Sequence, residues 1–549
     1  MQKSTEKTST QLGRAAICIV IIGSTLLGLA SFEPKKVHPA AASTQDLLFK
    51  TSYQLTDSGQ GQVLTNRVDG YRVILPKGAQ VAFDRAQLRT EISWTKDSRL
   101  DIYLTPTLPT DSDPAYYLQL CSGQDPSAPH AFRNSKDHQV TFQEEVQFAG
   151  LAGVATAWDR TPLTRVENDR PHYYAIDMIS DKGQGISFMY RAAQPISQSQ
   201  RDQVNAIADS LKLQPPSASP YMAPDPANRR HPLDLNQQTA AVYTKYFSKA
   251  APLRWGIFDP DYANQRYGYL HGLEKDFDTH FPFLVHYIDV INSDPESKIA
   301  PILNQAQAEG RAVELTFQTA NPPEGPNQVY EILNGKYDHY LEDLAVVIRE
   351  SRATILLRVG NEMNGDWCAY SPVHLSRDPD IYKAFYRYVC DFFSKEGVAG
   401  QMLFVWNPNE ADFPPYKWND PGLTWPGNEY VEIIGLTAYN NGTYYPHEKW
   451  RSFNAMYLPL YQEYQALYDQ PMMITEFSSS SFGGDKAAWV RDMLATIDTG
   501  YPNIKVAIWW NHEDFDPNKT GVVSRAYRID DNPDVLHAFR DYFANHNPA

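Results

Sequence analysis

The sequence TILLRVGNEMNGDW, residues 354–367, begins as an apolar run and ends in polar and acidic residues. The run lacks the alternation of apolar and polar residues, which is typical of a parallel strand covered on both faces. Asn361 and Glu362 follow it directly. Because the catalytic groups of a (β/α)8 barrel lie at the carboxyl ends of its strands, a Glu at this point has a functional interpretation.

A second apolar run also ends on a carboxylate. The sequence PMMITEF, residues 471–477, is a short predicted strand whose end carries Glu476. Retaining glycoside hydrolysis uses two carboxyl groups that face each other, one protonated and one ionised. Glu362 and Glu476 are therefore the candidate catalytic pair, and a buried ion pair of Glu362 with Arg358 is the structural alternative.

The C-terminal part of the chain, residues 236–549, alternates predicted strands with amphipathic segments such as 338–351 and 380–397. No Gly-rich phosphate loop follows the first strand, so a (β/α)8 TIM barrel fits better than an open α/β sheet. The eight predicted strands are Arg254–Phe258, Phe281–Val290, Ala312–Gln318, Thr354–Gly360, Met402–Trp406, Ile433–Thr437, Met472–Glu476 and Val506–Trp510.

Arg358, the run Asn361-Glu362-Met363-Asn364-Gly365 and Trp367 together resemble the acid/base segment of glycoside hydrolase family 26. This is a clan A family of (β/α)8 mannanases and related endo-glycanases, and the resemblance covers roughly residues 250–545. One position departs from the pattern, because the family usually has His where this chain has Asn361, the commoner arrangement in clan A. The resemblance implies that Glu362 is the acid/base and Glu476 the nucleophile.

The same resemblance implies contacts with the substrate. In clan A a Tyr after the sixth strand, here Tyr439, hydrogen-bonds the nucleophile, and Asn361 binds the sugar hydroxyl next to the reacting carbon. Trp510 resembles the Trp that supports the sugar ring. For Trp367 and Trp406, packing at the barrel rim is an equally good interpretation. The predicted substrate-binding residues are Arg358, Asn361, Trp367, Trp406, Tyr439 and Trp510, and we expect neither a metal nor another cofactor.

Composition narrows the choice of partner. The formal net charge of -16 disfavours nucleic acid, and it makes a neutral glycan a better substrate than an anionic one. The aromatic content of 13% suits the binding of sugar rings, although aromatic residues also fill cores. We expect a monomer. The four cysteines form neither a disulfide framework nor a metal-binding spacing, and buried free thiols are the interpretation that we favour.

The N-terminal residues 1–44 predict export. Lys3, Lys7 and Arg14 precede an uncharged, mostly apolar stretch at residues 15–32. The stretch is long for a signal-peptide core and barely long enough to span a bilayer, so a cleaved signal and a retained membrane anchor are both open. Either way, the bulk of the chain is predicted to be extracytoplasmic, membrane-anchored or secreted.

Residues 45–213 predict a smaller α+β accessory domain. Segments such as 71–76 and 173–179 alternate apolar and polar residues like half-buried antiparallel strands, and residues 197–213 have helical spacing. The region is loosely similar to the PsbP/Mog1-like domains of exported bacterial proteins, and we interpret it as a spacer. The Pro-rich residues 214–235 are the predicted linker.

These features predict a retaining endo-β-glycosidase that hydrolyses a neutral polysaccharide of the mannan, glucan or xylan type outside the cytoplasm. A catalytically silent, cell-surface glycan-binding protein would keep the cleft but would not require two opposed carboxylates. A transglycosylase that remodels an exopolysaccharide would use the same residues, with a sugar in place of water as the acceptor.

Overall fold

The computed structural model describes residues 51–59, 61–84, 86–108, 114–123, 135–222, 235–322 and 325–546. The signal or anchor predicted for residues 1–44 lies outside the described residues, as does most of the second half of the predicted linker. Within these described ranges, no helix is both long and apolar enough to cross a membrane.

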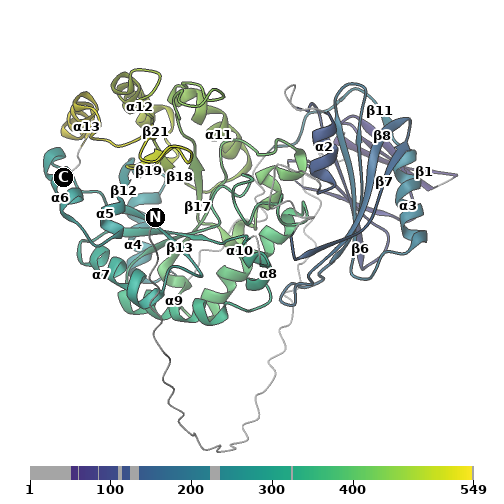
Figure 1. Cartoon of the computed structure of the whole chain (residues 1–549), viewed down its shortest axis with the longest axis horizontal. Coiled ribbons are helices and arrows are strands. Elements are labelled where there is room, and N and C mark those ends of the chain that lie inside the picture. The colour runs from purple at the N-terminus through teal and green to yellow at the C-terminus, as the bar shows by residue number, and fades with distance from the viewer. Residues whose placement is uncertain are drawn as a thin grey trace, which may run out of the picture. The chain divides into compact units, whose positions relative to one another are not determined.

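Eight parallel strands close into a barrel in the order of the sequence, which confirms the predicted barrel (Figure 1). The closure is visible in the register, because β12 pairs with β13 on one side and with β19 on the other. The strands are β12 (Arg254–Phe258), β13 (Phe283–Asp289), β14 (Ala312–Gln318), β15 (Ile355–Val359), β16 (Met402–Trp406), β17 (Ile433–Thr437), β18 (Met472–Phe477) and β19 (Ile504–Trp510).

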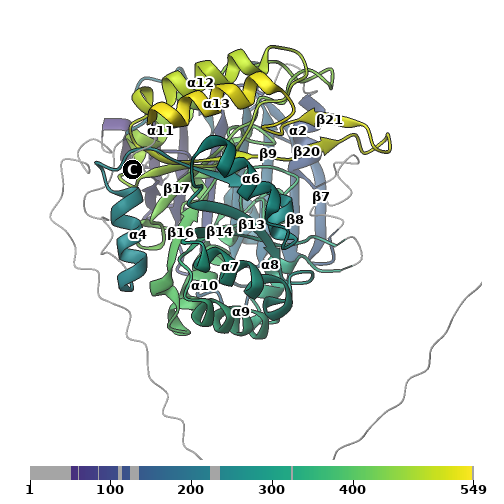
Figure 2. The same cartoon turned by 90° about the vertical axis from the view of Figure 1, so that its left-hand side faces the viewer.

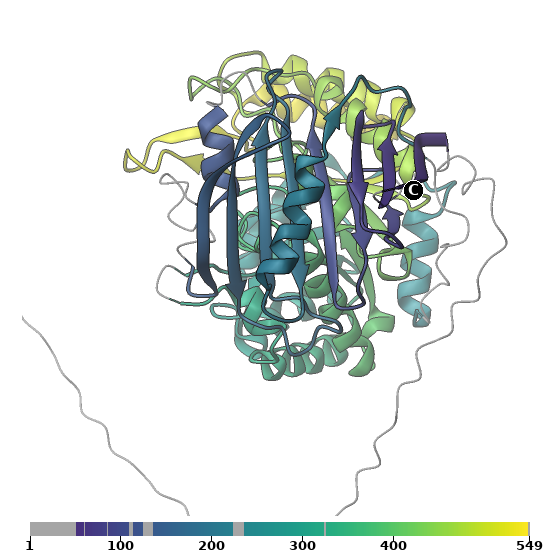
Figure 3. The ribbon, with the colours of Figure 1, turned by 90° about the vertical axis from the view of Figure 1, so that its right-hand side faces the viewer.

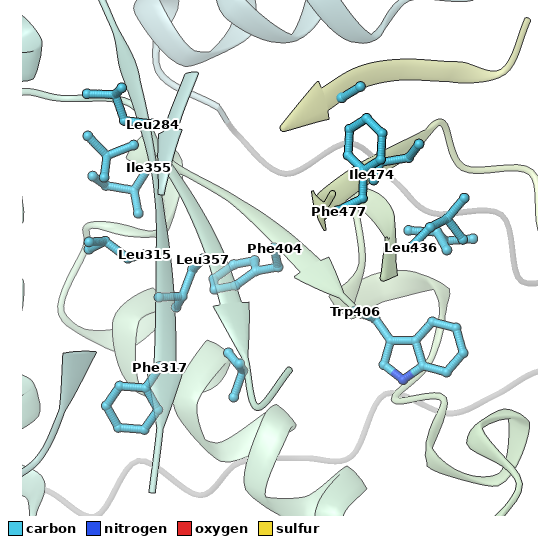
Figure 4. Close-up of a cluster of buried hydrophobic side chains, with 14 of the residues drawn as sticks. Leu284, Leu315, Phe317, Ile355, Leu357, Phe404, Trp406, Leu436, Ile474 and Phe477 are labelled. Atoms are coloured by element: carbon cyan, nitrogen blue, oxygen red, sulfur yellow. The ribbon is translucent and has the colours of Figure 1, made fainter. Parts of the chain in front are cut away.

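Helices lie around the strands (Figure 2). They are α6 (Gly268–Phe277), α7 (Ala300–Ala308), α9 (Asp338–Ser351), α10 (Pro379–Lys395), α11 (Phe453–Leu467), α12 (Lys486–Gly500) and α13 (Pro533–His546). Every second strand residue points outward into the large apolar core under these helices (Figure 4). On β15, these outward residues are Ile355, Leu357 and Val359.

The alternate residues of the strands fill the inside of the barrel. Its apolar layer contains Leu356, Val405 and Ile508, and it reaches Phe247 of helix α4 (Gln237–Phe247), which contacts the first residue of β13. Toward the carboxyl ends, the inward positions become polar. Leu356 is followed on the same side of β15 by Arg358, so the apolar barrel interior passes into the floor of a polar cleft.

The N-terminal part is built from antiparallel strands, as the alternating segments predict. Helix α3 (Gln198–Asp209), capped by Ser197, lies across one face of the larger sheet (Figure 3). The larger sheet has the order β4 (Gln80–Phe83), β5 (Thr90–Ser93), β6 (Ser98–Thr105), β10 (Gly185–Ala192), β9 (His172–Ile179), β8 (Leu151–Arg160) and β7 (His138–Phe148). The smaller sheet has the order β1 (Tyr53–Ser58), β2 (Gly61–Asn66), β3 (Tyr71–Leu75) and β11 (Lys212–Leu213).

The first residues of the predicted linker lie against this N-terminal part. The backbone N–H of Gln214 donates to the carbonyl of Gly70 at 2.8 Å, and that of Ser217 donates to the carbonyl of Arg67 at 2.8 Å. Gly70 has a φ of +75°, and a Cβ there would lie 2.2 Å from the Gln214 carbonyl oxygen. A glycine is therefore required where the chain returns to the sheet.

Candidate active site

A cleft of about 900 Å³ opens at the carboxyl ends of the barrel strands. Both candidate glutamates line it. The other strand ends contribute Tyr287 from β13, Gln318 from β14 and Trp510 from β19. The cleft therefore lies where the sequence predicts catalytic groups, at the ends of the apolar runs.

Glu362 is held by an unusual backbone turn directly after β15. Gly360 has a φ of +64° and leaves no room for a side chain, because a Cβ would lie 3.0 Å from the rings of Tyr370 and Tyr382. Glu362 itself has a φ of +52°, a conformation that is costly for a non-glycine residue and is characteristic of functional sites. Its N–H donates to the carbonyl of Asn407 at 2.7 Å, which fixes the turn.

The carboxyl of Glu362 receives one close hydrogen bond. The indole Nε1 of Trp367 donates to its Oε2 at 3.3 Å. Burial raises the pKa of Glu362, while Arg358 and Trp367 favour its ionised form. A carboxyl whose pKa is raised is suited to carry the proton that a leaving oxygen needs.

Glu476 lies at the end of β18 and is only 4% exposed. Arg358 donates from Nη2 to its Oε2 at 3.0 Å, and the hydroxyl of Tyr287 donates to the same oxygen. Burial and the nearby Asp514 carboxylate raise the pKa of Glu476 to about 8. The two hydrogen bonds act in the opposite direction, because they stabilise the carboxylate.

Glu314, which the sequence analysis missed, shares Arg358 with Glu476. Its Oε1 lies 2.7 Å from Arg358 Nε, and both side chains are fully buried. Burial raises the pKa of Glu314 to about 7, and Arg358 opposes this. The signal was present in the sequence, because the strand AVELTFQ places Glu314 and Thr316 on one face between apolar residues.

The remaining polar groups of the floor fix Arg358. Its Nη1 donates to Asn407 Oδ1 at 2.9 Å and its Nε to Thr316 Oγ1 at 2.8 Å. The guanidinium is therefore bound to a residue of β14 and to the residue that follows β16. Arg358 supports the carboxylate of Glu476 from below, and the structure places it under the cleft rather than among the residues that line it.

Asn361 lines the cleft beside Glu362. Its Oδ1 accepts hydrogen bonds from Tyr370 Oη at 2.7 Å and from Gln318 Nε2 at 2.9 Å. These two bonds orient the amide so that its Nδ2 faces Oε2 of Glu362 at 3.5 Å. The amide is thus held at the edge of the acidic pair, next to the cleft.

Two aromatic surfaces line the cleft. The Trp367 indole is 54% exposed, and its ring centroid lies 5.3 Å from that of Phe413. On the other side, Trp510 stacks on Phe258 with centroids 3.9 Å apart. Exposed rings of this kind can pack against the apolar faces of sugars.

Three of the predicted site residues behave differently from expectation, and Arg358, which lies under the cleft, is the first of them. Of the two interpretations of Trp406, substrate contact is wrong and packing is supported: the side chain is fully buried in the outer core, where its Nε1 donates to Thr424 Oγ1 at 3.2 Å. On β16 the side chain of Trp406 points outward into the core, whereas the side chains of Val405 and Asn407 point into the barrel. The tyrosine that donates to Glu476 is Tyr287. Tyr439 lines the cleft with its ring 5.3 Å from that of Tyr527.

One wall of the cleft carries paired charges that the sequence analysis did not identify. Arg451 donates to both oxygens of Glu410, with Nη1 2.6 Å from Oε2. Arg525 donates from Nε to Glu448 at 2.7 Å and from Nη1 to Asp514 at 2.8 Å. Each pair brings together residues from different loops, so no local sequence pattern could have shown it.

The charged side chains of the cleft do not form a metal site. Across the parts of the chain that the structure describes, no group of three or more His, Cys, Asp or Glu side chains could hold a metal ion. Cys121 and Cys368 are buried free thiols, as the sequence analysis favours, and Cys390 is also buried.

A closed eight-stranded parallel barrel with a glutamate at the ends of its fourth and seventh strands corresponds to the (β/α)8 glycosidases as a class. Comparison with known proteins is more specific. The sequence profile of glycosyl hydrolase family 26 matches residues 316–479, a segment that includes both glutamates. The C-terminal part of this chain is therefore similar to glycosyl hydrolase family 26.

Among curated proteins, Endoglucanase H of Acetivibrio thermocellus is 30% identical over 217 residues, which are 38% of this chain and 22% of that protein. The chain thus spans about a fifth of the length of this relative.

Solved structures of family 26 enzymes are also similar to this chain. The catalytic domain of an endo-β-1,4-mannanase from Bacillus sp. JAMB-750 has a TM-score of 0.42 and 15% identity, covering 58% of this chain and 93% of that one. A modular endo-β-1,4-mannanase from Cellulomonas fimi has a TM-score of 0.42 and 15% identity, covering 57% of this chain and 75% of that one.

Proposed function

We propose that this protein is a retaining endo-β-glycosidase that hydrolyses a neutral polysaccharide, with Glu362 as acid/base and Glu476 as nucleophile. One observation carries the proposal: two carboxyls line the same cleft in different surroundings. Glu476 accepts hydrogen bonds from a guanidinium and a phenol, whereas Glu362 accepts one from the neutral indole of Trp367. Different surroundings allow one carboxyl to be an anion while the other holds a proton.

The reaction follows in two steps. In the first, a carboxylate oxygen of Glu476 attacks the anomeric carbon, the bond to the leaving oxygen breaks, and Glu362 gives its proton to that oxygen. In the second, Glu362 takes a proton from a water molecule that attacks the anomeric carbon and releases Glu476. Arg358 and Tyr287 hold the Glu476 carboxylate for attack.

The charges of the cleft support a neutral substrate. Arg451 and Arg525 are each neutralised by carboxylates on the same wall, so they offer hydrogen bonds to hydroxyl groups without a surplus of positive charge. Mannans, glucans and xylans are neutral chains that present hydroxyl edges and apolar ring faces. The curated relative is named an endoglucanase, which supports including β-glucan among the glycans tested. Residues 15–32 support an extracytoplasmic location.

The test is to incubate the full chain with mannan, β-glucan and xylan and to measure the release of reducing ends. The first product of a cleaved glycan should have the β-anomeric configuration by NMR, because two displacements preserve it. Glu476→Gln keeps the shape of the side chain and should abolish release.

Three other results would contradict the proposed function. An initial α-anomer would refute retention. A wild-type protein that binds these glycans but cleaves none of them would be a glycan-binding protein, and one that releases product only when an acceptor sugar is added would be a transglycosylase.

A further inference from the structure

Two loops of the barrel form one side of the cleft. The loop of residues 360–378 follows β15 and carries Glu362 and Trp367, and the loop of residues 407–432 follows β16 and carries Glu410 and Phe413. The far sides of both loops contact the N-terminal sheets.

The first loop is anchored by a buried ion pair. Arg377 donates to both oxygens of Asp177 on β9, at 2.9 and 3.0 Å, and both side chains are almost fully buried. Ser376 and Arg377 have φ values of +62° and +56°. Two successive non-glycine residues in this conformation persist only when their surroundings impose it, and the Asp177 carboxylate is part of those surroundings.

Residues next to Arg377 are held in the same way. Asp378 pairs with Arg191 of β10 and accepts a hydrogen bond from Tyr173 of β9 at 2.8 Å. Ser376 Oγ lies 2.8 Å from Nε2 of His138 on β7. Three consecutive loop residues are thus bound to three strands of the larger N-terminal sheet.

The second loop has its own contacts with the N-terminal sheets. Lys417 pairs with Asp69, and its backbone N–H donates to Thr105 Oγ1 of β6 at 3.1 Å. The ring of Tyr416 lies edge-on to Tyr117, with centroids 4.9 Å apart. These residues belong to a buried apolar cluster that draws on both the N-terminal part and the barrel loops.

Asn364 joins the two loops to each other. Its Nδ2 donates to the carbonyl of Asn409 at 3.0 Å, and its Oδ1 accepts from the N–H of Asn409 at 2.8 Å. Its carbonyl accepts from Asn419 Nδ2 at 2.8 Å and from the N–H of Phe413 at 2.8 Å. A displacement of either loop would therefore reach the residues that flank Glu362.

We propose that the N-terminal domain is part of the active unit: Asp177 and its neighbours hold the two loops that carry the acid/base side of the cleft, and Arg377 is a positioning residue. This replaces the interpretation of residues 45–213 as a spacer. The proposal rests on the proposed function for its effect on catalysis, but the loop order that it describes can be measured without any substrate.

The test uses the full chain with Arg377→Met and a matched control, Arg311→Met. Arg311 also forms a buried bidentate pair, with Glu274 at 2.5 and 2.8 Å, but it lies just before β14 at the opposite end of the barrel. Both variants should therefore unfold at a lower temperature. Only Arg377→Met should speed amide hydrogen exchange in residues 360–378, by about tenfold or more.

Kinetics give the second measurement. On a glycan that the wild type cleaves, kcat/KM of Arg377→Met should fall by about 10²-fold, the effect of a small misplacement of reacting groups. Arg311→Met should keep the wild-type value below its unfolding temperature. Equal exchange in residues 360–378 for both variants, or equal kcat/KM, would overturn the proposal.

A second variant covers the case in which Arg377→Met does not fold. Lys417→Met removes a pair that is less deeply buried than Arg377–Asp177, with side chains 15% and 5% exposed, so it should cost less stability. It should speed exchange in residues 407–424, and unchanged exchange there would also overturn the proposal. If no glycan is cleaved but exchange rises as described, the proposed function fails and the holding of the loops stands.

Discussion

Trp367 and Glu362 are joined by a hydrogen bond of 3.3 Å from the indole Nε1 to the carboxyl Oε2. The same indole is the most exposed aromatic surface of the cleft. A sugar that packs on this ring would therefore contact the group that orients the proposed acid. Gly365 makes the arrangement possible, because a Cβ at this position would lie 2.5 Å from the Trp367 ring.

Gly365→Ala should therefore displace the indole and lower kcat/KM on long glycans by about tenfold to 10²-fold. Trp367→Phe is the matched variant, since it keeps an aromatic surface and removes only the N–H. That N–H favours ionised Glu362, so its loss should raise the pKa of Glu362. Because Glu362 must be protonated to act as the acid, the basic limb of the kcat/KM profile should move to higher pH. A limb that stays in place would contradict the role of the hydrogen bond.

The two glutamates should respond differently to the leaving group. Glu476→Ala should abolish hydrolysis of every substrate, because no glycosyl-enzyme can form. Glu362→Ala should lose about 10² to 10⁴-fold on natural glycans yet still react with an activated aryl glycoside, which needs no acid. Added azide should then speed turnover of this variant and give a β-glycosyl azide. Identical behaviour of the two variants would reject the assignment of roles.

We expect Asp514 to influence the acid limb of the kcat/KM–pH profile through its effect on the pKa of Glu476. Its negative charge contributes to the raised pKa of Glu476, about 8, and Glu476 must be ionised to attack. Asp514→Asn should lower that pKa, so activity should persist to lower pH, by about one pH unit or less. Asp516→Asn, two residues further along the chain, is the control and should leave the limb unchanged. A shift to higher pH in Asp514→Asn would contradict the electrostatic assignment.

Trp510 and Trp509 are adjacent on β19 but face opposite sides. Trp510→Ala should lower turnover of long glycans strongly with little loss of stability, since the ring is partly exposed in the cleft. Trp509→Phe should do the reverse: it removes packing from the outer core and lowers the unfolding temperature without changing kcat. Wild-type kinetics for Trp510→Ala would reassign this ring to packing.

The barrel could be predicted from the sequence because most of its strands are predominantly apolar runs separated by amphipathic segments. The predicted strands at 402–406 and 433–437 match those of the structure residue for residue, since strands covered on both faces are mostly apolar. The two glutamates were found for the same reason: a carboxylate at the end of such a run stands out.

Two features of the site could not be predicted from the sequence. One is the side of the strand that a residue at its end faces, and the other is contacts between residues far apart in the chain. Trp406 stands one residue before the inward-facing Asn407, and a strand end alone does not show which side a large ring takes. Tyr287 lies near the end of β13 and Tyr439 lies just after β17, so the choice between them depends on how the strands are staggered around the barrel. The contact of Arg377 with Asp177 joins residues about 200 positions apart, and no local pattern encodes it.

The left-handed backbone conformation at Glu362 affects which residues position 362 can accept. Glycine or asparagine would adopt a φ of +52° at less cost than Glu, so folding alone favours their replacement of Glu362. Under the proposed function, the carboxyl of Glu362 is therefore held in the cleft at a conformational cost that glycine or asparagine would avoid.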